Sequence, residues 1–171
     1  VKEITFTYSG DSTAKCYYSD NYFAKSAYNY SPSLATMSLS FAMSAFGSSD
    51  GGQTDYTNKS SNARALLKEM GFADENIAVN DRFTKKPTTD SIGVIIGNKP
   101  VKVKDEEYTL IAVAVRGGGY EQEWASNFTI GTSGQHQGFN TAKNNVLSYL
   151  KQYISKQGIS GQVKIWVTGY S

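Results

Sequence analysis

The sequence is short of the residues from which metal centres and disulfide frameworks are built. Its 171 residues include one cysteine, Cys16, and one histidine, His136. A single cysteine cannot form an intrachain disulfide or a multi-cysteine zinc site, and a single histidine cannot form a multi-histidine metal site. We expect no metal and no organic cofactor, because the chemistry inferred below for Ser171 requires neither. One imidazole is available within these residues for acid–base chemistry.

An excess of charge and a long apolar run are also missing. The 17 basic and 15 acidic residues leave a net charge of +2. This balance argues against a nucleic-acid partner and against a polybasic membrane anchor. No apolar run approaches the roughly 20 residues needed to span a bilayer, so we expect no transmembrane segment. Hydrophobic residues make up 39% of the chain, which suffices for the core of one domain.

Proline is scarce, whereas tyrosine and glycine are abundant. The chain holds three Pro against 12 Tyr and 16 Gly, and only 19% of its residues are charged. Such a polar but weakly charged surface is common in secreted bacterial proteins, and the sequence starts at Val1 rather than Met. We therefore predict an extracellular protein whose leader has been removed, with a cytoplasmic location as the alternative.

The first hundred residues predict a mixture of strand and helix. Alternating apolar residues predict a strand over residues 1–8, followed by a Tyr- and Ser-rich connection over 9–30. Ser31 and Pro32 predict the start of a helix that runs to about residue 46. A second helix is expected from Ser60 or Ser61 to Gly71, with a short strand at 76–79 and a stronger one at 91–97 (SIGVIIG).

The remainder alternates between strand and helix. YTLIAVAV at 108–115 is nearly all apolar, which is typical of a strand covered on both faces. An apolar stripe predicts a long helix over 139–156, and VKIWVT at 163–168 predicts a last strand. This order favours an α/β fold with a mostly parallel sheet flanked by helices. Ligands of such sheets gather at the carboxyl ends of the strands.

Ser171 lies at one such end, in the tripeptide Gly169-Tyr170-Ser171. A serine hydroxyl becomes a useful nucleophile when a sharp turn after a strand exposes it and a neighbouring base removes its proton. Gly169 and Ser171 match the first half of the G-x-S-x-G pattern of such turns. The alternative is that these residues form an ordinary polar segment.

A second candidate feature follows the strand at 108–115, where the chain reads Arg116-Gly117-Gly118-Gly119. Backbone N–H groups in a glycine loop can approach a substrate closely and hold the negative oxygen of a tetrahedral intermediate. A phosphate-binding loop is disfavoured because no Gly-Lys-Ser/Thr follows. A flexible turn without chemistry is the alternative.

Taken in order, four motifs resemble the class 3 lipase family, which comprises serine esterases of the α/β-hydrolase fold. They are LIAVAVRGGG, EWASNFTI with Trp124, HQGF from His136 to Phe139, and VKIWVTGYS. The resemblance covers roughly residues 108–171. It implies that residues 1–171 are the N-terminal portion of one α/β-hydrolase domain. Residues 1–100 would form a strand and helical part, and residues 101–171 would carry the core sheet, the oxyanion loop and the nucleophile elbow.

The resemblance also implies roles for individual residues. Ser171 would be the nucleophile, Gly118 an oxyanion donor with Gly119 as the near alternative, and Arg116 a structural residue that holds the loop. The triad order of this fold, Ser then Asp then His, would place both partners after Ser171. His136 precedes Ser171, so we expect it to pack and hydrogen-bond at the start of a helix.

Three positions depart from the family pattern. Tyr170 stands where many members have His, Gly118 where they have Ser or Thr, and Asn127 where Asp is usual. These departures bear on substrate preference more than on reaction type.

With this resemblance, the sequence predicts a carboxylic-ester hydrolase that acts on small-molecule or lipid esters. Its expected partner is the remainder of the hydrolase domain. Contact with a lipid interface is a further expectation. One alternative is an α/β-hydrolase-like binding or surface module that has lost catalysis. Another is a glycan- or peptide-binding domain complete as given.

Among the remaining residues, Cys16 is expected to be an inert thiol. Aromatic residues at Tyr22, Phe23, Tyr28 and Tyr30 are expected to pack, with an acyl pocket as the alternative.

Overall fold

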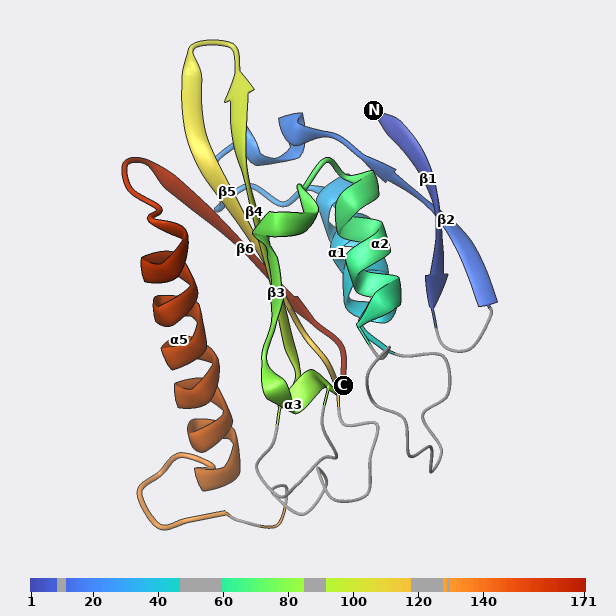
Figure 1. The fold of residues 1–171 in the computed structure, drawn as a ribbon. Coiled ribbons are helices and arrows are strands. Elements are labelled where there is room, and N and C mark those ends of the chain that lie inside the picture. The colour runs from blue at the N-terminus through green and yellow to red at the C-terminus, as the bar shows by residue number, and fades with distance from the viewer. Residues whose placement is uncertain (9–11, 47–59, 85–91, 118–127, 129) are drawn as a thin grey trace.

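The computed structural model describes residues 1–8, 12–46, 60–84, 92–117, 128 and 130–171. Within these residues the chain has an α/β architecture, in which a mixed sheet is flanked by helices. Figure 1 shows the long helix α5 on one side of this sheet, and the shorter helices α1 and α2 with a small hairpin on the other.

The N-terminal hairpin contains one strand that was predicted and one that was missed. β1 (Lys2–Tyr8) pairs antiparallel with β2 (Ser12–Tyr18), with Ile4 opposite Cys16. The connection expected over 9–30 therefore contains a strand, followed by the short 3-10 helix η1 (Asp20–Phe23). The alternation that marks β2 is inconspicuous in the sequence, because its inward-facing residues are Ala14, Cys16 and Tyr18.

Helices α1 (Pro32–Ser44) and α2 (Ser61–Glu69) begin and end close to the predicted positions. The Ser31 hydroxyl oxygen accepts a hydrogen bond from the Leu34 N–H at 3.3 Å, so the predicted N-cap of α1 is confirmed. After α2, Gly71 takes a φ of +91°, which a residue with a side chain rarely adopts. Both helices contribute to a core that lies between the hairpin and the larger sheet, through Met37, Phe41, Leu66 and Leu67 among others.

The larger sheet has the order β3-β4-β5-β6 among the described strands. They are β3 (Ile77–Val79), β4 (Val94–Val103), β5 (Glu106–Val115) and β6 (Val163–Gly169), with the short helix α3 (Asp81–Thr84) between β3 and β4. The expected mostly parallel arrangement is wrong for these strands. β4 runs antiparallel to both β3 and β5, and only β5 and β6 run parallel.

The physical reason for the mixed order lies in the connection between β4 and β5. Val103 pairs with Glu106, so only Lys104 and Asp105 link the two strands, and Lys104 takes a φ of +55°. A two-residue link can join only antiparallel neighbours, because a parallel crossover needs a dozen or more residues. The sheet also starts earlier than residue 101, since β3 and most of β4 precede it.

Helix α5 (Gln137–Gln157) covers the opposite face of the sheet and ends at Gly158, which has a φ of +64°. Its stripe packs on Val94, Ile96, Ile111 and Val113. β5 is therefore buried on both faces, as its apolar sequence predicts. The chain between β5 and β6 thus includes a helix that packs on the sheet, as a parallel crossover requires.

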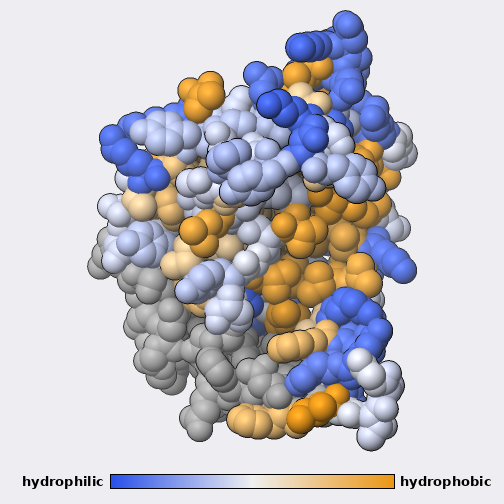
Figure 2. All heavy atoms as spheres, turned by 180° about the vertical axis from the view of Figure 1, so that it is seen from behind, coloured by the Kyte–Doolittle hydropathy of each residue, from blue (hydrophilic) through white to orange (hydrophobic). Residues whose placement is uncertain are grey.

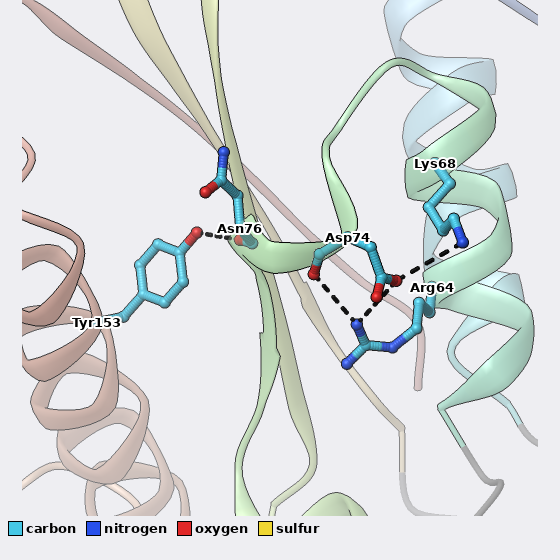
Figure 3. Close-up of polar contacts among 5 residues, drawn as sticks. All are labelled: Arg64, Lys68, Asp74, Asn76 and Tyr153. Carbon is cyan, nitrogen blue, oxygen red and sulfur yellow. Dashed lines mark hydrogen bonds and ion pairs between the residues drawn. The ribbon is translucent and has the colours of Figure 1, made fainter.

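Polar contacts tie the flanking helices to the 3-10 helix η2 (Asp74–Asn76), as Figure 3 shows. On the α5 side, the Tyr153 hydroxyl donates to the Asn76 carbonyl oxygen and accepts from the buried Asn98 amide at 2.7 Å. On the α2 side, the Asp74 carboxylate contacts Arg64 at 3.3 Å and Lys68 at 3.7 Å. These contacts connect both α2 and α5 to η2, the 3-10 helix that directly precedes the short strand β3.

Candidate active site at the ends of β5 and β6

The two candidate segments follow two neighbouring parallel strands and therefore lie at the same edge of the sheet. β5 and β6 pair in parallel, and Val115 at the end of β5 lies opposite Gly169 at the end of β6. The residues that follow, Arg116 and Gly117 after β5 and Tyr170 and Ser171 after β6, therefore emerge side by side. The sequence-based expectation that both segments lie at carboxyl ends of strands is confirmed.

Gly117 shows how closely the two segments approach. A Cβ built on Gly117 would overlap the Tyr170 carbonyl oxygen, and it would lie 2.9 Å from the Phe46 ring and 3.2 Å from the Ser171 carbonyl oxygen. Only a residue without a side chain fits this position, so the backbones of the two segments are in contact. The close approach of these two backbone segments thus explains why a glycine follows Arg116.

Ser171 is exposed and has an unusual backbone conformation. Its φ of +61° places it in the left-handed region, which non-glycine residues seldom occupy. A residue held in such a region stores about 1–3 kcal/mol, and such residues are concentrated at functional sites.

Arg116 is buried and holds the beginning of the glycine loop. Its guanidinium donates to the Phe83 carbonyl oxygen at 3.4 Å and lies 4.9 Å from the centre of the Phe83 ring. Its backbone N–H donates to the Gly93 carbonyl oxygen at 2.8 Å. These contacts anchor Arg116 to Phe83 in α3 and to Gly93, the residue directly before β4. They agree with the structural role expected for Arg116.

The end of β6 is fixed to helix α1 by contacts that sequence analysis did not identify. The Trp166 indole N–H donates to the Ser38 hydroxyl at 2.8 Å, and the Thr168 hydroxyl donates to the Ser38 carbonyl oxygen at 2.7 Å. The ring of Tyr170 meets Phe46 edge-on at 6.1 Å. Trp166 and Thr168 alternate along β6 and Tyr170 follows it at the same spacing, so the period-two pattern of a strand could have assigned them to one face.

His136 takes the structural place predicted for it. It is the N-cap of α5, where its Nδ1 accepts from the Phe139 N–H at 3.3 Å and its ring stacks on Phe139 at 4.3 Å. Gly118, Gly119, Trp124 and Asn127 lie outside the described residues, so the predicted oxyanion donors Gly118 and Gly119 remain predictions.

Within the described parts of the chain, no group of three or more His, Cys, Asp or Glu residues could hold a metal ion. None of the helices in those same parts is both long and apolar enough to cross a membrane. Cys16 is buried, and burial raises the pKa of its thiol to about 11. Because the thiolate is the reactive form, this thiol is inert at neutral pH, as expected.

No family model, no curated protein and no solved structure matches this chain. The chemistry of the site is therefore argued from its geometry and from the residues present.

Proposed function

We propose that this protein is a carboxylic-ester hydrolase of the α/β-hydrolase type, with Ser171 as its nucleophile. The observation that supports the proposal most directly is the backbone contact of Gly117 with Tyr170 and Ser171. An ester hydrolase needs a nucleophile within reach of backbone donors for the oxyanion. Here the glycine loop starts against the residues at the end of β6.

In the proposed mechanism the Ser171 hydroxyl oxygen attacks the ester carbonyl carbon. The negative oxygen of the tetrahedral intermediate accepts hydrogen bonds from the N–H of Gly118, or of Gly119 if the loop is shifted, and from the residue after Ser171. A histidine that follows Ser171 takes the hydroxyl proton and passes it to the leaving alcohol, and an aspartate orients that histidine. Water then hydrolyses the acyl-serine ester by the same route.

The surroundings of Ser171 support this assignment. Its positive φ matches the strained turn at which a nucleophile is raised above a sheet. The anchors of β6 on Ser38 and of Arg116 on Phe83 fix both segments, so their relative position is set before any substrate binds. Such preorganisation is the source of most oxyanion stabilisation, because no donor has to be reoriented during the reaction.

The test is labelling of the full-length protein with a fluorophosphonate probe, followed by mapping of the modified residue. We expect modification of Ser171, and loss of both labelling and p-nitrophenyl ester hydrolysis in Ser171→Ala. Ser155→Ala, which changes an exposed serine on α5, is the matched control and should keep both. If the folded protein is not labelled at Ser171, the hydrolase assignment is wrong, and a module that binds without catalysis becomes the better description.

A further inference from the structure

A pair of aromatic rings lies where the two segments of the candidate active site meet. Phe46 follows helix α1, and Tyr170 directly precedes Ser171. The centres of their rings are 6.1 Å apart, and the ring planes meet edge-on at 76°. The Phe46 ring would also lie 2.9 Å from a Cβ on Gly117. The pair is therefore next to the proposed nucleophile and to the segment that follows β5.

Both rings are carried by backbone that is tied to α1. Tyr170 follows β6 at the alternate-residue spacing of Trp166, whose indole N–H donates to Ser38 of α1 at 2.8 Å. Tyr170 is thus on the face of the sheet that α1 covers. The Phe46 N–H donates to the Met43 carbonyl oxygen at 3.2 Å, which holds Phe46 against the last turn of α1. These contacts set the positions of the two residues before any substrate binds.

The pair is more open than the other aromatic contacts on this face. Trp166 packs against Phe23 and Phe41 with ring centres 5.3 and 5.1 Å apart, and all three side chains are buried. In contrast, Phe46 is partly exposed and Tyr170 is 51% exposed. Phe46 and Tyr170 therefore keep ring surface with which a bound molecule can make contact.

A second exposed apolar surface lies on the other face of β6. Ile165 and Val167 belong to this face, and Figure 2 shows the hydrophobic band that runs over β6 and toward α5. Under the proposed function, further residues of the domain follow Ser171, and we expect them to cover this band. Tyr170 differs because it is bonded to the proposed nucleophile. The space beside a nucleophile has to stay open for the substrate.

The chemistry of the pair selects among apolar groups. Aromatic rings attract one another in edge-on and offset arrangements, and such pairs contribute more than the area they bury. A third ring can add to an edge-on pair in the same way, whereas a saturated chain gains only from the burial of its surface. A flexible chain also loses more conformational freedom on binding than a planar ring does. The pair therefore favours a group that contains an aromatic ring.

We propose that Phe46 and Tyr170 contact the substrate at the candidate active site, and that this substrate is an ester with an aromatic ring next to its scissile bond. The inference rests on the proposed function, because it takes Ser171 to be the nucleophile. The ring can belong to the acyl group or to the alcohol, and the experiment distinguishes the two.

The experiment compares two matched pairs of esters with the full-length protein. Benzyl acetate and cyclohexylmethyl acetate differ in the ring of the alcohol. The p-nitrophenyl esters of phenylacetate and cyclohexylacetate differ in the ring of the acyl group. After correction for the rates of alkaline hydrolysis, we expect kcat/KM to be higher by about fivefold or more for the aromatic member of one pair. Both members are measured on the same sample, so their ratio does not depend on the fraction of active protein.

Variants assign the preference to the two rings. Tyr170→Leu and Phe46→Leu each keep an apolar side chain but remove a ring, so the preference should fall to about twofold or less. Tyr170→Phe keeps the ring and should retain the preference. Tyr28→Leu is the matched control, because it removes a tyrosine that is 99% exposed and lies outside the pair. It should also retain the preference.

The wild-type protein gives a second measurement of the same contact, which does not require the leucine variants to fold. The aromatic product of the preferred pair, benzyl alcohol or phenylacetate, should shift the ring signals of Phe46 and Tyr170 in ¹³C–¹H spectra. Unchanged ring signals at saturating product would overturn the inference.

The remaining outcomes separate this inference from the proposed function. Fluorophosphonate labelling of Ser171 without an aromatic preference would refute the inference alone. A preference that survives in both leucine variants, or one that is lost in Tyr28→Leu, would mean that other residues contact the ring, and the inference would again be wrong. Absence of labelling in the folded wild-type protein would refute both proposals.

Discussion

The backbone of Gly117 lies directly against the carbonyl oxygen of Tyr170, with no room between them for a side chain. Two segments more than fifty residues apart in sequence thereby fix each other's position at the edge of the sheet. Phe46, just after α1, lies next to both of them: a Cβ on Gly117 would come within 2.9 Å of its ring, and the same ring meets the Tyr170 ring edge-on. The relative position of Gly117 and Ser171 is therefore a property of the packed fold.

The first prediction concerns this contact. Gly117→Ala should move the loop away from Ser171, because its Cβ would overlap main-chain atoms that cannot rotate aside. We expect fluorophosphonate labelling of Ser171 and ester hydrolysis to fall by at least tenfold, in line with the loss of an oxyanion donor. Gly161→Ala is the control for the steric effect. Unlike Gly117, Gly161 has a positive φ, so alanine is strained there, but nothing lies within 4 Å of the new Cβ and labelling should be retained. Equal losses in both variants would contradict the steric explanation.

The second prediction concerns the anchor of β6 on α1. Ser38→Ala removes the acceptor of the Trp166 indole N–H, which is buried and would be left without this partner. We expect the free energy of unfolding to fall by about 1–3 kcal/mol, the cost of an unsatisfied buried donor. Urea denaturation followed by tryptophan fluorescence measures it. Ser33→Ala, in the exposed first turn of the same helix, should change stability by less than about 0.5 kcal/mol.

Sequence analysis located most elements because their signals are local. Ser31 caps α1, Gly158 ends α5, and the apolar run of β5 marks a strand buried on both faces. Each of these depends on a backbone conformation or a burial pattern that neighbouring residues determine. Sheet order is different, because it depends on which strands meet. The antiparallel β4–β5 pair follows from the two-residue link at Lys104 and Asp105, and the sequence analysis did not use that link to assign the directions of the strands.

The candidate site was predictable to a similar extent. Ser171 and Arg116 were identified because each follows an apolar strand, and the structure places their backbones at one edge. The contribution of Ser38 and Phe46 could not be inferred, since Ser38 on α1 and Phe46 just after α1 are distant in sequence and carry no motif. Lys99 was likewise missed, because a lysine in a strand gives no sign of being buried until its partners are known.

The third prediction concerns Lys99, which joins β4 to the N-terminal hairpin region. Its ammonium group is largely buried, bonds the Asp20 carboxylate and the Met70 carbonyl oxygen at 2.6 Å each, and lies over the Tyr18 ring. Lys99→Met would leave these acceptors without their cation. We expect a loss of about 2–3 kcal/mol, below the roughly 3–5 kcal/mol typical of broken buried pairs because Asp20 is partly exposed.

A matched control for Lys99 is present on the same strand. Lys102 pairs with Glu107 at 2.7 Å, but both side chains are about 70% exposed. Lys102→Met should therefore cost less than about 1 kcal/mol. Chemical denaturation of both variants gives the comparison, and a similar loss in each would show that burial does not govern the strength of these pairs.

The fourth prediction is a pH dependence that arises from Cys16. Burial raises the pKa of its thiol from 9.0 to about 11, because the packed core disfavours the thiolate. The folded state therefore holds this proton to higher pH than the unfolded state does. The resulting stabilisation is complete below pH 9 and is lost as the pH rises from 9 to about 11. Over this interval the unfolding free energy of the protein should fall more steeply than that of Cys16→Ala. All other groups are common to both proteins, so the difference between the two curves isolates the thiol. Parallel curves would show that burial does not raise the pKa of the Cys16 thiol. Rapid reaction of the native protein with a thiol reagent at pH 8 would lead to the same conclusion.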